Sequence, residues 1–264
     1  MIDTLQAPAT TTELMTIASA RLLKNHQVCF VGIGLPSAAA NLARITHAPE
    51  VVLIYESGPI GARPTVLPLS IGDGDLALAA DTVVSTPEIF RYWLQGGRVD
   101  IGFLGAAQID RFANLNSTVI GSYEHPKIRL PGAGGAPEIA SNAREVFVIL
   151  RQSHRTFVNK VDFITTIGYG DGGDHRARLK LPGRGPTKIV TDLCIMEPEP
   201  GANELTVTSL HAGVTREQVI QNTGWPIQFA DHVEVIAPAT ELELAVLRDL
   251  QHRTMIAHGT ATGE

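Results

Sequence analysis

Residues 51–58 read VVLIYESG and carry the clearest indication of the architecture. The first five residues of this stretch form an apolar, β-branched run of the kind that makes a buried parallel strand, and Glu56 stands where that strand ends. Gly58 and Pro59 then mark the point at which the chain turns away. Because open α/β sheets bind ligands beyond the carboxyl ends of their strands, Glu56 is expected to face a crevice. The alternative is an ordinary solvated glutamate at a strand end.

The residues before this stretch predict a strand–helix–strand unit. Residues 10–25 are expected to form a helix, because Thr10 and Glu13 have the spacing of a capping box. Residues 28–31 are β-branched and apolar, and the turn at 32–36 then leads into a helix of small residues. This order implies a right-handed crossover and a largely parallel sheet.

The remainder of the chain continues the same pattern of strands and helices. Further strands are expected at 101–104, 117–120, 145–150, 161–166, 188–191 and 205–209, and helices at 87–95, 137–143, 215–222 and 240–255. Residues 168–185, rich in Gly, Asp and Arg, are expected to form a long excursion of the functional or interfacial kind. The fold class predicted is α/β, with an open, largely parallel sheet and flanking helices.

Composition narrows the possible partners. The chain has 264 residues, of which 44% are hydrophobic and 18% charged, so it can bury the core of one large domain or two small ones. Its net charge of −6, without a run of Lys or Arg, argues against nucleic acid or a membrane surface as a binding partner. Cys29 and Cys194 lie in apolar runs and are expected to be buried thiols, as in a cytoplasmic protein. Neither a signal sequence nor a membrane-spanning run is indicated.

Glycine and amide motifs supply further candidate site residues. Residues 132–136 read Gly-Ala-Gly-Gly-Ala before an expected helix, so that their backbone N–H groups can converge on an anion or a developing oxyanion. A flexible glycine turn is the alternative. Gln108, in the turn 105–110, and the segment 114–118 could orient a ligand or could cap turns of their own backbone.

Other motifs exclude several kinds of site. The turn 32–34 lacks the third glycine of a dinucleotide fingerprint, and the nine histidines have no metal-ligand spacing, so that no metal site is expected. Arg63 could bind a second carboxylate or point into solvent. A local basic patch could meet phosphates, face solvent or contact another subunit, and its members are Arg151, His154, Arg155 and Lys160.

In this order, the motifs resemble those of the B (β) subunit of class I coenzyme A transferases of the glutaconate CoA-transferase type. The resemblance extends to about Thr223 and is carried by residues 32–36, 56–58, 105–110, 116–118, 125–127, 132–136 and 159–162. It implies a CoA-transferase fold, with residues 1–264 as a single domain of the B (β) type. It also implies a separately encoded A (α) subunit in a hetero-oligomer (αβ)n.

The resemblance also assigns roles to individual residues. It makes Glu56 the nucleophile. Oxyanion and CoA binding are assigned to Gly132, Ala133, Gly134 and Gly135, and substrate binding to Ser57, Gly58 and Gln108. Coenzyme A is a substrate in this family, and no other cofactor is expected.

The implied chemistry suits a carboxylate without a histidine partner. A carboxylate can attack an acyl-CoA thioester to give an anhydride and then a glutamyl-CoA thioester, from which a second carboxylic acid collects CoA. No proton moves in these ping-pong steps. The acid stays open, with dicarboxylic and 3-oxo acids among the candidates. An acyl-CoA hydrolase on the same scaffold and a non-catalytic acyl-CoA-binding protein are the alternatives.

Overall fold

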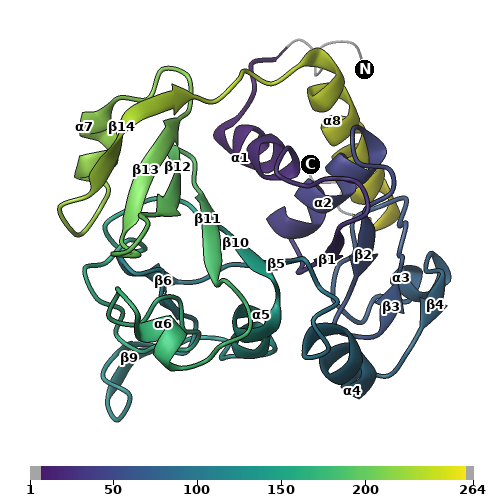
Figure 1. Cartoon of the computed structure of the whole chain (residues 1–264). Coiled ribbons are helices and arrows are strands. Elements are labelled where there is room, and N and C mark those ends of the chain that lie inside the picture. The colour runs from purple at the N-terminus through teal and green to yellow at the C-terminus, as the bar shows by residue number, and fades with distance from the viewer. Residues whose placement is uncertain (1–6, 260–264) are drawn as a thin grey trace. The chain divides into compact units, whose positions relative to one another are not determined.

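The computed structural model describes residues 7–259. The chain forms two compact units, one built from residues up to Trp93 together with those from Pro238 onward, and the other from Leu94–Ala237 (Figure 1). Each unit has its own strands and helices.

Unit 1 places an apolar strand pair among helices. Strands β1 (Val28–Phe30) and β2 (Val52–Ile54) are parallel, and β3 (Pro59–Ile60) and β4 (Thr82–Val83) add antiparallel strands beside β2. Its helices are α1 (Thr11–Ala20), α2 (Leu35–Ile45), α3 (Gly74–Leu78), α4 (Thr86–Glu88) and α8 (Glu241–Ala257), and a π-helical segment, Ile89–Leu94, follows α4. Leu53, Ile54 and Tyr55 are fully buried, so the strand that leads to Glu56 is part of the core.

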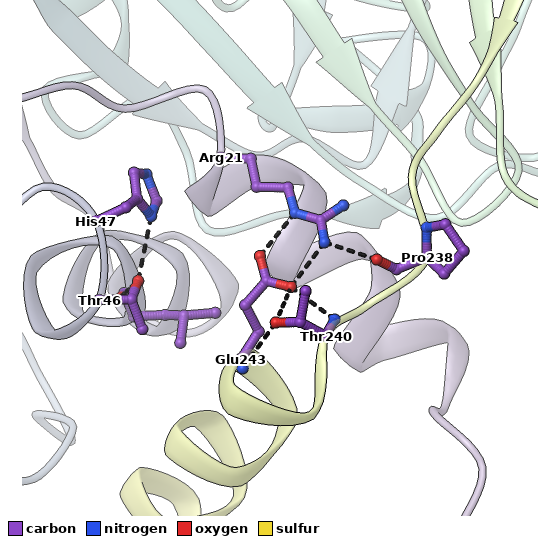
Figure 2. Close-up of polar contacts among 7 residues, drawn as sticks. Arg21, Thr46, His47, Pro238, Thr240 and Glu243 are labelled. Atoms are coloured by element: carbon purple, nitrogen blue, oxygen red, sulfur yellow. Dashed lines mark hydrogen bonds and ion pairs between the residues drawn. The ribbon is translucent and has the colours of Figure 1, made fainter.

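Two ion pairs attach α8 to α1. Arg21 binds the Glu243 carboxylate at 2.6 Å and also donates to the Pro238 carbonyl at 2.7 Å, as Figure 2 shows. Arg248 binds Glu13 at 2.6 Å, and both of these side chains are largely buried. The last helix of the chain is therefore held on the first by charged contacts as well as by packing.

Unit 2 contains a six-stranded mixed sheet in the order β14-β13-β12-β11-β10-β5. Strands β5 (Ile101–Leu104), β10 (Glu145–Ile149) and β11 (Pro186–Val190) are parallel, while β12 (Cys194–Pro198) is antiparallel to both neighbours, and β13 (Leu205–Leu210) is parallel to β14 (Gln228–Val235). Helix α5 (Ala136–Asn142) packs on β5 and β10, and α6 (His175–Arg178) and α7 (Arg216–Gln221) complete the helices. Two small hairpins pair β6 (Gln108–Ile109) with β7 (Leu115–Asn116) and β8 (Val119–Gly121) with β9 (Pro126–Arg129).

The structure confirms the predicted α/β class with open sheets and flanking helices, and the parallel strands lie where apolar runs indicated them. The strand expected at 161–166 is wrong, because that segment makes only an isolated bridge, between Leu115 and Thr166. Cys29 and Cys194 are buried and form no disulfide in the described residues, as expected. Within the described chain, no helix combines the length and apolar character needed to cross a membrane.

The Glu243 contact predicts a pH dependence of stability. Burial alone would raise the pKa of Glu243, but the hydrogen bonds from Arg21 and Thr240 outweigh burial and lower this pKa from 4.5 to about 2. A group whose pKa is lowered by folding stabilises the protein above its unfolded pKa, and this stabilisation disappears as pH falls through the folded value. The Glu243→Gln variant should therefore unfold at lower urea concentration than the wild type at pH 7, and the gap should shrink between pH 4.5 and pH 2.

The control is Glu241→Gln, which removes an exposed carboxylate from the same helical turn. This variant should follow the wild-type curve. A gap for Glu243→Gln that stays constant down to pH 2 would contradict the assignment.

Candidate active site

Glu56 lies in a tight turn directly after β2. The Gly58 N–H donates to the Tyr55 carbonyl at 3.0 Å, and the Tyr55 N–H donates to the Pro59 carbonyl at 3.0 Å. The Gly58 carbonyl in turn accepts from the Val84 N–H at 3.1 Å. These bonds tie the turn to β2, to β3 and to the end of β4, so the backbone of Glu56 is fixed on both sides.

The Glu56 carboxylate is half-buried and has no hydrogen-bond or ion-pair partner among residues 7–259. Burial raises its pKa above 4.5. Glu13 and Glu243, which also lie in unit 1, are each bound by an arginine. A carboxylate that has lost water without gaining a partner is a stronger base and nucleophile than a paired one. Glu56 is therefore suited to bond formation and contributes nothing visible to holding the fold.

Ser57 and Gly58 shape the turn around Glu56. The Ser57 hydroxyl donates a short hydrogen bond to the Ile71 carbonyl, which brings the segment before α3 against the turn. Gly58 has φ +121°, and a Cβ at this position would lie 2.0 Å from the Val84 carbonyl oxygen. The expected contact of these two residues with substrate stays a prediction, and in this structure Ser57 contacts Ile71 while Gly58 contacts Tyr55 and Val84. Arg63, further along, is exposed and forms a bidentate pair with Asp81 at 2.7 and 3.1 Å.

The glycine segment 132–135 lies in unit 2, immediately before α5. Gly132 and Gly134 have positive φ values of +104° and +49°, which most other residues would adopt only under strain. The N–H groups of residues 133–135 donate to no acceptor within the part of the chain described. Three consecutive free N–H groups on a bent backbone are the arrangement that binds an oxyanion.

Ser117 holds the start of this segment from both sides. Its carbonyl accepts from the Gly132 N–H at 2.8 Å, and its hydroxyl donates to the Gly132 carbonyl at 2.8 Å. The Ser117 N–H donates to the Thr165 hydroxyl at 2.9 Å, and that hydroxyl lies 2.7 Å from the hydroxyl of Thr118. The position of Gly132 is thus set by side chains that are distant in sequence.

Gln108 belongs to the same network. It is buried, its Oε1 accepts from Asn116 Nδ2 at 2.7 Å, and its Nε2 donates to Asp162 Oδ2 at 3.1 Å. Asn116 Oδ1 then accepts from the Thr118 N–H at 3.0 Å. Because the Gln108 amide is bound inside the protein, these contacts favour a positioning role, and its expected contact with substrate stays a prediction. The Asn116 side chain caps its own turn, which is one of the two roles expected for residues 114–118. The partners of Ser117 were not predicted, because Thr165 and Gly132 lie elsewhere in the chain.

Comparison with known proteins agrees with these features. Residues 12–222 match the family model described as coenzyme A transferase. The chain belongs to this family of enzymes, which move CoA between an acyl-CoA and a carboxylic acid, as the resemblance in the sequence implied.

Individual relatives make the match more specific. The chain is 71% identical to the B subunit of 3-oxoadipate CoA-transferase of Pseudomonas knackmussii, over 96% of this chain and 98% of the relative. It is 36% identical to the B subunit of glutaconate CoA-transferase of Acidaminococcus fermentans, over 87% and 88%. The crystal structure of that organism's glutaconate CoA-transferase superposes with a TM-score of 0.85 at 31% identity and covers 91% of this chain and 94% of the other. The decarboxylase AibA/AibB, at 24% identity with a TM-score of 0.80 over 93% and 96% of the two chains, shares the fold.

The Gly58 geometry predicts a cost for any added side chain. Gly58→Ala should lower the free energy of unfolding by more than about 1 kcal/mol, because it combines a strained φ with a clash against the Val84 carbonyl. Gly97→Ala is the matched control, since Gly97 has φ +70° but nothing within 4 Å of its Cβ position. Urea unfolding measures both. Equal losses in the two variants would show that the clash at Gly58 does not matter.

Proposed function

We propose that this chain is the B subunit of a CoA-transferase that moves CoA from an acyl-CoA to 3-oxoadipate, with Glu56 as the nucleophile. The choice of acid is supported by the 71% identity to the B subunit of a 3-oxoadipate CoA-transferase over nearly the whole of both chains. The nucleophile is supported by one observation above all, the half-buried Glu56 carboxylate on a fixed turn without a partner in residues 7–259.

The proposal includes a separately encoded A subunit. The 3-oxoadipate and glutaconate relatives are both named as B subunits, and the related structures AibA/AibB and IpdAB carry paired names. We therefore expect a hetero-oligomer of the form (αβ)n. The two units would act together as one domain of the B type, because the family model spans parts of both.

Catalysis would proceed by two acyl transfers on Glu56. A Glu56 oxygen attacks the thioester carbonyl of the donor, the carbon–sulfur bond breaks, and CoA leaves as the thiolate with a mixed anhydride behind it. The thiolate then attacks the glutamyl carbonyl, the anhydride carbon–oxygen bond breaks, and the donor acid leaves as a carboxylate. Incoming 3-oxoadipate reverses these steps and departs as its CoA thioester. No general acid or base is needed, since only carboxylates and a thiolate enter and leave.

Each step passes through a tetrahedral oxyanion, and we assign its stabilisation to the backbone N–H groups of residues 133–135. One well-placed donor of this kind contributes about 3 kcal/mol to catalysis. Ser57 and Gly58 are proposed to border the substrate next to the nucleophile. Coenzyme A is the substrate in this scheme, and no other cofactor is required. The buried, reduced cysteines Cys29 and Cys194 support a cytoplasmic location.

The nucleophile can be tested by trapping. Incubation of the complex with the A subunit and an acyl-CoA should place a CoA adduct on the peptide that contains Glu56, detected by mass spectrometry. Glu56→Gln should lose the adduct and lower kcat by more than about 1,000-fold while the complex still assembles, because the amide cannot form the anhydride. Glu50→Gln, an exposed glutamate before β2, is the control. Transfer to 3-oxoadipate that persists in Glu56→Gln would refute the mechanism, and thioester loss without transfer would indicate a hydrolase.

The two hydrogen bonds between Ser117 and Gly132, which we call the Ser117 clamp, predict a positioning effect on the catalytic rate. Ser117→Ala removes the hydroxyl that binds the Gly132 carbonyl, so the N–H groups that follow should be less well placed in the transition state. We expect kcat to fall about 10-fold with KM for the acyl-CoA changed less than about two-fold. Ser141→Ala, which removes a hydroxyl from α5 outside the clamp, should leave both values unchanged. A rise in KM at constant kcat would contradict a role in the transition state.

A further inference from the structure

Unit 2 contains a pocket of about 260 Å³ that the proposed chemistry does not use. Its walls come from the segment after β6 and from the loop between 159 and 171. The side chains that matter for its chemistry are Arg111, Phe112, Asn159 and Lys160. Lys160 also belongs to the basic patch that the sequence indicated.

The positive charges of the pocket are not neutralised by the protein. Neither Arg111 nor Lys160 makes an ion pair with any acidic residue in the 7–259 range. The Arg111 guanidinium instead stacks on the Phe112 ring, 4.9 Å from its centroid. Stacking fixes the plane of a guanidinium and leaves its N–H edge free for an oxygen ligand.

Of the two carboxylates that line the pocket, Asp110 is held by the protein, whereas the Asp171 side chain is 88% exposed. Asp110 is buried, and its Oδ1 accepts from the backbone N–H groups of Phe112 and Asn114 at 3.0 and 3.1 Å. Asp171 lies 3.2 Å from the His175 ring. A ligand that enters this pocket therefore meets two cations without an acidic partner in the described residues, one buried carboxylate bound by backbone N–H groups, and one exposed carboxylate beside His175.

The pocket adjoins the network that holds the glycine segment. Asn114 and Ile164 line it, and Ile164 directly precedes Thr165, the acceptor of the Ser117 N–H. Asn114 stands three residues before Ser117, a span of about 10 Å along an extended chain. A ligand bound in this pocket would therefore contact residues that adjoin Ser117 and its partner Thr165.

We propose that this pocket binds a phosphate ester, with Arg111 and Lys160 as its cationic contacts and the Asn159 amide as a further donor. Planar guanidinium and ammonium donors side by side are the groups with which proteins bind phosphate oxygens. The phosphate could belong to the nucleotide end of CoA, an assignment that rests on the proposed function, or to a separate phosphorylated metabolite. The chemistry of recognition is the same for both sources.

Binding of ADP to the complex of this chain with its A subunit tests the pocket without any turnover. By isothermal titration, the wild type should bind ADP more tightly than adenosine, which has no phosphate. The double variant Arg111→Gln/Lys160→Gln should raise the Kd for ADP at least about 10-fold and leave that for adenosine unchanged. The control, Arg155→Gln/Lys180→Gln, removes two exposed charges of the same unit outside the pocket and should bind ADP as the wild type does. Equal ADP affinity in wild type and pocket variant would overturn the proposal.

Kinetics with two donors then identify the source of the phosphate. If CoA supplies it, the pocket variant should raise KM for an acyl-CoA about 10-fold and leave KM for the matching acyl-pantetheine, which lacks phosphates, unchanged. If ADP affinity falls while both KM values stay constant, a separate phosphorylated ligand occupies the pocket. Failure of the proposed function would show instead as a wild-type complex without the Glu56 adduct, a result that leaves the titration with ADP intact.

Discussion

In unit 1, the turn that presents Glu56 holds in a fixed position a carboxylate that is unpaired within residues 7–259. Leaving a half-buried carboxylate without a partner is unfavourable, because it loses hydration and gains no compensating hydrogen bond. The turn tolerates it because the backbone is fixed by bonds to Tyr55, Pro59 and Val84, and because Gly58 alone fits against the Val84 carbonyl. Fully buried apolar residues of β2 anchor the other side. Stability in this region comes from backbone bonds and packing, which leaves the carboxylate free for chemistry.

In unit 2 the roles of backbone and side chains are reversed, because side chains there hold the backbone of the glycine segment in position. Gln108, Asn116 and Thr165 are occupied with one another or with Ser117, and their combined effect is to hold Gly132 in place. Backbone N–H groups suit the stabilisation of an oxyanion because they carry no titratable group and need little reorganisation when charge develops. A glycine segment alone is flexible, so its use as a donor requires a rigid support of this kind. The buried amides and hydroxyls around it supply that support.

The sequence predicted the elements that are locally encoded. Apolar strands such as β5 and β10, the capping box at Thr10 and the two buried thiols all follow from residues that are neighbours in the chain. Strand β14 was missed because it carries acidic and polar residues at sheet positions that only tertiary context makes favourable. The segment 161–166 alternates like a strand, yet the Asp162 and Thr165 side chains bond to Gln108 and Ser117 instead. Residues that are separated by about 50 positions in the chain form these contacts, so the local sequence shows no pattern of them. Neither the structure of segment 161–166 nor the burial of Gln108 could therefore be inferred from the sequence alone.

The charged residues that maintain the fold of unit 1 form ion pairs, whereas the charged residues proposed to act on ligands form none within the described residues. Arg21 with Glu243 and Arg248 with Glu13 are largely buried and paired, and they join helices that are far apart in sequence. Breaking one of these pairs would leave a charge buried and alone, which makes them structural requirements. Glu56, Arg111 and Lys160 have no oppositely charged partner in the chain between residues 7 and 259, and each is accessible from a turn or a pocket. These three charges do not hold the fold, and each lies where a ligand can reach it. The acid suits attack on an acyl carbon, and the two cations suit a phosphate.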